Sequence, residues 1–225
     1  MMTNEDVLKT ILRGEPQLSK ELLQAIADSS STIGPQLLEL IKSIRLWHTE
    51  DAGRWAVLHA IRIVSSLQMK SAIAPLVDAI FLAASTRHED ALEDLPVALA
   101  RSGEAAIRPL QAVLEDSRLD GTIRSVAASA LEGIAVLDST TRIAVLDILR
   151  KVVADTGDLS SVRGHAITIV AHFRMPEDIP LIKNVARTLP LMLDLEPDEI
   201  EAWFEQTGEP ESWGVYRESL LNYYR

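Results

Sequence analysis

The chain contains no cysteine, which excludes disulfide bonds, thiol nucleophiles and thiolate metal sites. It also lacks an apolar run of roughly 18 residues, the length that a membrane span requires. The opening stretch, Met1 to Gly14, lacks the basic and apolar regions of a signal peptide. We therefore expect a cytoplasmic protein without membrane association.

Catalytic signatures are also scarce. The glycines are isolated, so no phosphate-binding loop is formed, and no serine stands in a Gly-x-Ser-x-Gly elbow. The sequence therefore predicts no catalytic residue and no cofactor.

Basic residues are few relative to acidic ones: 22 Lys and Arg face 33 Asp and Glu, for a net charge of −11. A polyanion would be repelled unless a local basic stripe overcame this field. We therefore expect no nucleic acid partner. The 47% hydrophobic content is that of a folded globular chain.

Period-two alternation is missing too, whereas apolar residues recur at helical spacing almost everywhere. Within this pattern, a short element in which proline or its equivalent precedes leucine recurs at steps of 40, 34, 36 and 35 residues. Such a period predicts helix-hairpin repeats. The repeated positions are Pro35, Pro75, Pro109, Val145 and Pro180.

A second element follows each of the first four copies. An arginine is trailed by small or apolar residues three, six and seven positions later, which lets neighbouring helices approach closely and bury one face. The leading positions are Arg54, Leu92, Arg124 and Arg163, so one of the four copies has leucine in place of arginine.

The two elements together resemble HEAT repeats, particularly the short HEAT-like repeats of phycobilisome lyases, over roughly residues 31–190. This resemblance implies an all-α protein, a right-handed α-α superhelix of about five helix pairs with terminal caps. We expect a single domain over residues 1–225. Its parts are an N-terminal helical hairpin (1–30), the repeats (31–190) and an acidic-aromatic C-terminal cap (191–225).

Both ends of the chain differ from the middle. In the hairpin, helices at 5–13 and 17–27 should place Leu8, Ile11, Leu12, Leu22, Leu23 and Ile26 in the core. The last 32 residues hold nine acids against two arginines, and six of the ten aromatic residues in the chain. We favour a polar cap closing the last repeat. The alternative is that Trp203, Trp213 and Tyr216 anchor a partner.

Several charged groups admit a functional and a structural interpretation. His165 and His172, seven residues apart, share a helix face, but no cluster of further ligands accompanies them, so we predict no metal site. The groups His48 with Glu50 and Asp51, and His88 with Glu89 and Asp90, could act as acid and base, but helix capping is the simpler account. The arginines of the second elements could form a ladder for an anion. We favour pairing with an acid of the neighbouring repeat.

The leading hypothesis for function is a non-enzymatic protein-interaction module or scaffold whose partner is another protein and whose oligomeric state is open. An alternative from the resemblance is a bilin-lyase-type or chaperone-like protein. A HEAT-like DNA glycosylase comes third, because the acidic balance opposes DNA binding. The second helices should offer a concave face with Arg62, Ser65, Arg101, Ser125, Ser129, Glu132, Thr168 and His172.

Overall fold

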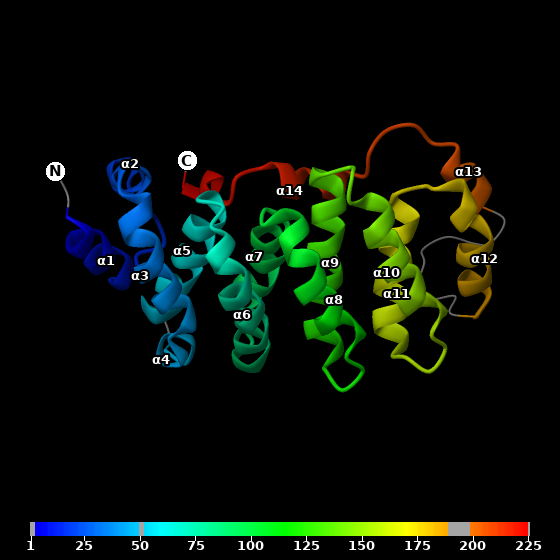
Figure 1. Cartoon of the computed structure of the whole chain (residues 1–225), viewed down its shortest axis with the longest axis horizontal. Helices are drawn as coiled ribbons and strands as arrows, with labels where there is room; N and C mark the ends of the chain where they lie inside the picture. The colour runs from blue at the N-terminus through cyan, green and yellow to red at the C-terminus, as the bar shows by residue number, and fades with distance from the viewer. Residues whose placement is uncertain (1–2, 50–51, 189–198, 225) are drawn as a thin grey trace.

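The computed structural model describes residues 3–49, 52–188 and 199–224, and within these ranges it consists of helices without β-strands (Figure 1). The predicted all-α class is therefore confirmed. Along these same ranges, no helix combines the length and the apolar character needed to cross a membrane.

The bounds of the helices follow in chain order. The α-helices are α1 (Asn4–Leu12), α2 (Lys20–Asp28), α3 (Ser30–Lys42), α4 (Ile44–Trp47), α5 (Ala52–Ser66), α6 (Ile73–Thr86), α7 (Glu89–Ala100), α8 (Ile107–Glu115), α9 (Gly121–Leu137), α10 (Arg142–Ala154), α11 (Ser160–His172), α12 (Ile179–Thr188), α13 (Ile200–Phe204) and α14 (Gly214–Arg217). Short 3-10 helices are η1 (Lys70–Ala72), η2 (Gly103–Ala106), η3 (Pro176–Asp178), η4 (Glu211–Trp213) and η5 (Leu220–Tyr224).

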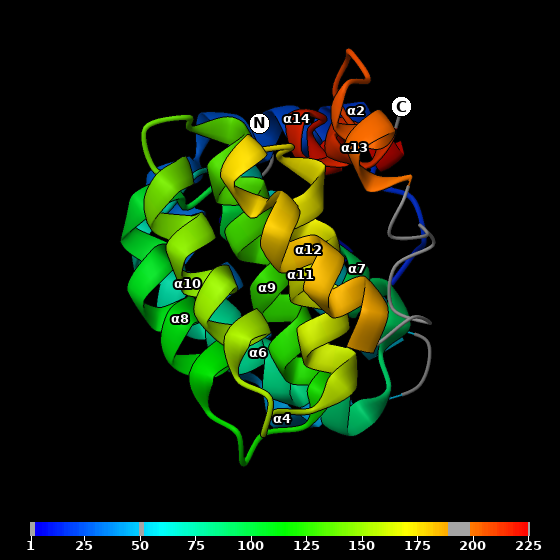
Figure 2. The same ribbon diagram turned by 90° about the vertical axis from the view of Figure 1, so that its right-hand side faces the viewer.

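From α1 to α12 the helices follow one another along the long axis of the molecule in chain order (Figure 1), and in a view down this axis α8 and α10 lie to one side of α9 and α11 (Figure 2). We call α3, α6, α8 and α10, in which consecutive members contact one another, the first-helix layer, and α5, α7, α9 and α11 the second-helix layer; α12 follows and packs against α11. Each helix of the second layer packs against the first-layer helix that precedes it, and α5, α7 and α9 each pack against the next second-layer helix. Four of the five predicted proline positions fall in the first-helix layer, and the fifth, Pro180, falls in α12.

The first two helices, α1 and α2, pack against each other and against α3. Ile11, Leu22 and Ile26 are buried, but Leu12 is 43% exposed, so its predicted core position is wrong. Val7 and Ile11 lie one turn apart on the inner side of α1, and the residue after Ile11 is rotated by about 100° away from that side.

Two arginines of the second elements pair with acids of the next helix pair, as expected. Arg124 is 1% exposed; both ends of its guanidinium contact the carboxylate of Asp158, and its Nε donates to Leu114 O at 2.7 Å. Arg54 Nη2 donates to Asp90 Oδ2 at 3.0 Å. These two arginines therefore tie consecutive pairs together, whereas Arg163 donates its Nε to Val153 O at 3.0 Å within its own helix pair.

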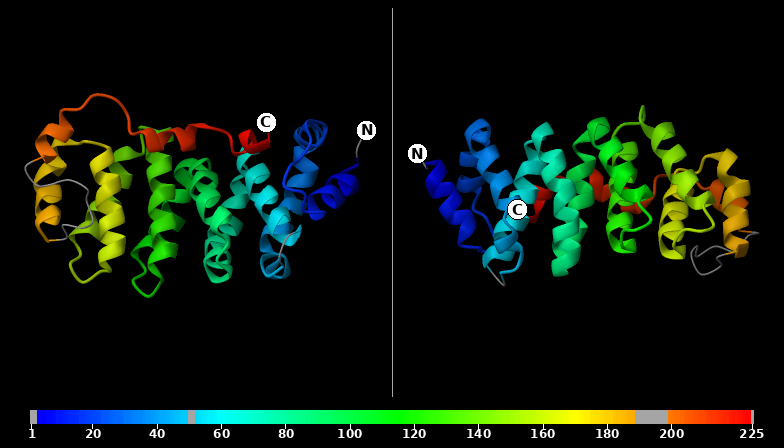
Figure 3. Two further views of the ribbon diagram at one scale, coloured as in Figure 1. Left: turned by 180° about the vertical axis from the view of Figure 1, so that it is seen from behind. Right: turned by 60° about the horizontal axis from the view of Figure 1, so that its bottom comes forward.

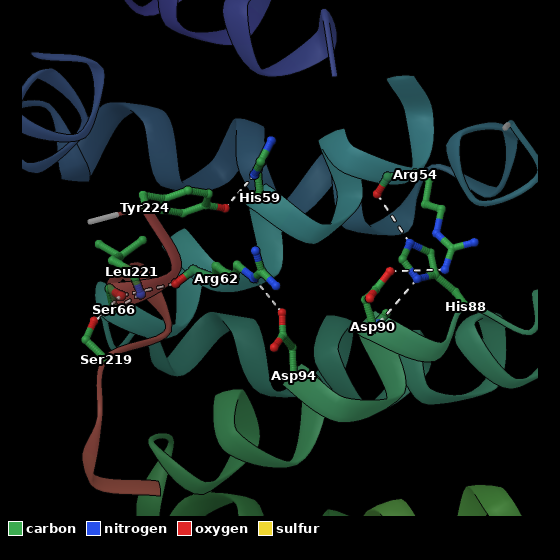
Figure 4. Close-up of polar contacts among 11 residues, drawn as sticks. Arg54, His59, Arg62, Ser66, His88, Asp90, Asp94, Ser219, Leu221 and Tyr224 are labelled. Carbon is green, nitrogen blue, oxygen red and sulfur yellow. Dashed lines mark hydrogen bonds and ion pairs between the residues drawn. The ribbon is translucent and has the colours of Figure 1, made fainter. Parts of the chain in front are cut away.

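The capping interpretation is confirmed for one histidine group. His88 is the N-cap of α7, and its Nδ1 accepts a hydrogen bond from Ala91 N at 3.3 Å (Figure 4). The other group includes Glu50 and Asp51, which lie outside the described residues.

The C-terminal segment, residues 199–224, takes a path that differs from the predicted cap. Only α13 packs on α12 at the end of the array. The chain then turns back across the second-helix layer, where α14 contacts α9 and α7 and η5 contacts α5 (Figures 1 and 3). The predicted boundary at 190/191 lies outside the described residues.

Candidate functional site

Most of the predicted site residues lie beside or within the C-terminal segment, which runs back past helices of the second layer, whereas the contacts of Ser125 and Thr168 are with His165 and Gly164. The predicted site residues come from α5 (Arg62), the end of α7 (Arg101), α9 (Ser125, Ser129, Glu132), α11 (Thr168, His172), α13 (Trp203), η4 (Trp213) and α14 (Tyr216). Arg62, Ser65, Glu132, Trp213 and Tyr216 are buried. While the segment is docked, these side chains do not face a partner as the sequence interpretation expected.

Glu132 is the centre of the docked segment. Its carboxylate accepts hydrogen bonds from Trp213 Nε1 at 3.0 Å, from the Tyr216 hydroxyl at 3.2 Å and from His172 Nδ1 at 2.8 Å. The Tyr216 hydroxyl also lies 2.9 Å from Ser129 O, a second acceptor. A buried carboxylate requires such donors, since an unpaired charge would be strongly destabilising.

The aromatic rings beside Glu132 fill the space next to α9. Tyr216 lies against Gly133, where an added Cβ would approach Tyr216 Cδ1 to 2.5 Å and Ala100 Cβ to 2.6 Å. Only glycine therefore lets α7, α9 and the ring meet here. Burial, followed by the nearby Glu132 carboxylate, raises the pKa of Tyr216, which keeps the phenol protonated. Trp213 packs on Phe173 with ring centroids 4.8 Å apart.

Two arginines hold the backbone of the segment. Arg101 Nη2 donates to the carbonyl oxygens of residues 216, 217 and 218. Arg174 Nη1 donates to Gln206 O at 2.7 Å and Gly208 O at 2.9 Å, and its guanidinium carbon lies 4.8 Å from the Trp203 ring centroid. Both cations are committed to the segment. Arg174 was not predicted, because its carbonyl partners are more than 30 residues away in sequence.

At the far end of the segment, the contacts involve α5 (Figure 4). His59 Nε2 must carry the proton, because its partner at 2.7 Å is Glu15 O, so Nδ1 accepts from the Tyr224 hydroxyl at 2.5 Å. Burial lowers the pKa of His59 to about 4. Arg62 Nε donates to Asp94 Oδ2 at 2.6 Å, and both side chains are buried. His59 and Asp94 were missed in the sequence, since their partners lie on other elements.

The remaining polar residues offer little chemistry. Ser129 Oγ lies 2.8 Å from His165 Nε2, and burial lowers the pKa of His165. However, Ser129 stands within α9, where backbone N–H groups are engaged in the helix and none is free to stabilise an oxyanion. Ser125 contributes its carbonyl to His165, and the Thr168 hydroxyl donates to Gly164 O. Among the residues placed in the structure, no group of three His, Asp or Glu side chains could hold a metal ion.

A groove of about 620 Å³ runs between α7 and the C-terminal segment. Its α7 side includes Leu92, Pro96 and Val97, and its opposite wall includes Val215, Leu220 and Tyr223. Val215 is 55% exposed and Tyr223 is 57% exposed. The docked segment thus forms one wall of an apolar groove on the second-helix layer.

No protein-family model, curated protein or solved structure matches the chain.

Proposed function

We propose that the chain is a non-catalytic protein-interaction module, a HEAT-like right-handed superhelix of about five helix pairs whose second-helix layer binds a segment of another protein. The sequence period near 35 residues and the ordered packing of consecutive helix pairs support the repeat architecture. Repeat arrays of this kind commonly use the inner layer as an extended binding surface.

The observation that carries the binding proposal is the groove between α7 and the C-terminal segment. Large apolar side chains are usually buried, and an exposed group of them beside a concavity is typical of an interaction site. Val215 and Tyr223 form such a group together with Leu92, which is half-buried.

Site-specific photo-crosslinking tests this function. A benzophenone amino acid replaces Val215 in the groove, and a matched variant carries it at Ile143 of α10, which is 52% exposed and lies on the first-helix layer. We expect the Val215 position to give a discrete crosslinked species in the native cell extract, and the Ile143 position to lack it. Identical crosslinking patterns from the two positions would contradict the proposed binding surface.

A further inference from the structure

The charge of the groove lining is of one sign. Three carboxylates, Glu93, Asp94 and Glu218, are among its lining residues, and the lining includes no lysine or arginine. The nearest cations are already used: Arg62 pairs with Asp94, and Arg101 holds carbonyl oxygens of the segment. Glu93 and Glu218 are exposed, and neither forms an ion pair within the described part of the chain.

These carboxylates converge on one side chain. The pKa of Tyr223 is raised, first by its partial burial and then by Asp94; Arg62 opposes this shift, and Glu93 and Glu218 add smaller contributions to it. The Tyr223 ring in turn stacks on Arg62, whose guanidinium carbon lies 4.2 Å from the ring centroid. Acids from α7 and from the C-terminal segment thus line the same groove as this exposed aromatic ring, and Arg62 is the one cation that contacts the ring among the described residues.

Apolar side chains and negative charge therefore occupy the same groove. We propose that its occupant is a partner segment in which an apolar side chain lies next to lysine or arginine, so that the apolar group contacts Val215 and Leu220 and the cation meets Glu93 and Glu218. This inference rests on the proposed function and adds the chemistry of the partner. The net charge of −11 favours the encounter with a basic segment over an acidic one.

Two synthetic peptides test the charge preference. Both peptides have nine residues and the same leucines; the intervening positions are lysine in one peptide and glutamate in the other. Binding of each peptide to the full chain is measured by fluorescence anisotropy at low and at high salt. We expect the lysine peptide to bind at least about tenfold more tightly than the glutamate peptide. High salt should reduce that ratio, because exposed ion pairs are screened.

Three variants separate the groove from the overall charge. Replacing both groove acids, Glu93→Gln with Glu218→Gln, should weaken the lysine peptide about fivefold, the effect of losing two exposed ion pairs. The matched control, Glu104→Gln with Glu115→Gln, removes the same charge from η2 and α8 and should leave affinity unchanged. Val215→Ser should weaken binding by removing an apolar contact.

Each outcome has a definite meaning. If both peptides bind alike and Val215→Ser weakens both, the groove binds a segment but the charge preference is overturned. If the control pair weakens the lysine peptide as much as the groove pair, attraction is general and the proposed site is overturned. If neither peptide binds, or Val215→Ser leaves binding unchanged, use of the groove itself is refuted, and the proposed function loses its main support.

Discussion

Replacing Glu132 by alanine should release the C-terminal segment from the second-helix layer. The carboxylate accepts three hydrogen bonds, and its removal has a different consequence for each of the three donors. His172 is half-buried and reaches water, and Tyr216 retains Ser129 O as an acceptor. Trp213 is buried, and Glu132 is the one acceptor of its indole N–H among the described residues, so the variant leaves this N–H unpaired.

The expected change in the free energy of docking follows from these three hydrogen bonds. An orphaned buried donor costs about 1–3 kcal/mol, and the lost charge-assisted bond from His172 adds about 1 kcal/mol. The free energy of docking should become less favourable by about 3 kcal/mol. Where hydrogen exchange follows the opening equilibrium, this corresponds to exchange about 100-fold faster. The amides to follow are those of Trp213 and Glu218, which bond to Pro210 O and Gly214 O. Trypsin cleavage after Arg217 gives a second measurement.

A conservative variant separates hydrogen bonding from charge. In Glu132→Gln, the amide oxygen can still accept from Trp213, while the amide nitrogen can donate to the Tyr216 hydroxyl, whose own hydrogen points to Ser129 O. We expect the segment to stay docked in this variant. If hydrogen exchange of the segment were unchanged in Glu132→Ala, or if docking weakened equally in the two variants, the argument from these hydrogen bonds would be refuted. Amides of α10 report whether the whole fold has been affected.

Three further predictions concern stability. Asp158→Ala leaves the fully buried Arg124 guanidinium without its carboxylate and should lower the free energy of unfolding in urea by about 3 kcal/mol; a loss below 1 kcal/mol would contradict the buried pair. Gly133→Ala should displace the Tyr216 ring and lower the melting temperature, although alanine favours helix by about 1 kcal/mol; a rise would show that the contact is not tight. Since burial lowers the pKa of His59 from 6.5 to about 4, the unfolded state binds the extra proton, and stability should fall by about 3 kcal/mol between pH 6.5 and 4. Denaturation of His59→Phe over this range should lack that part of the pH dependence.

The parts of the fold that depend on local pattern could be predicted from the sequence. The proline positions mark the first-helix layer, because the same short pattern must bury the same face in each pair. The pairing of Arg124 with an acid could also be predicted from the sequence, because an arginine at a repeated apolar position requires a nearby acid. Leu12 was misplaced because a one-residue rotation on a short helix decides between core and solvent.

The path of the C-terminal segment could not be predicted in the same way. Its aromatic and acidic residues are compatible with a terminal cap and equally with a segment that turns back along the array. The contact that decides between them joins Trp213 to Glu132, which are 81 residues apart. Two signals on α9 were nevertheless present: an acid within an apolar helix and an adjacent isolated glycine, which often marks a close approach of another element. Together they indicate that something packs on α9, but not which part of the chain.

The return of the segment has a consequence for binding, because it supplies one wall of the groove. Val215, Leu220 and Tyr223 belong to the segment, whereas Leu92 and Val97 belong to α7. A groove made this way exists only while the segment is docked, so apparent affinity for a partner scales with the docked fraction. Glu132→Ala changes no groove-lining residue, yet it should weaken the lysine peptide by the factor by which it lowers the docked fraction, a fraction that hydrogen exchange measures independently. By the same linkage, a bound peptide should slow exchange at Glu218.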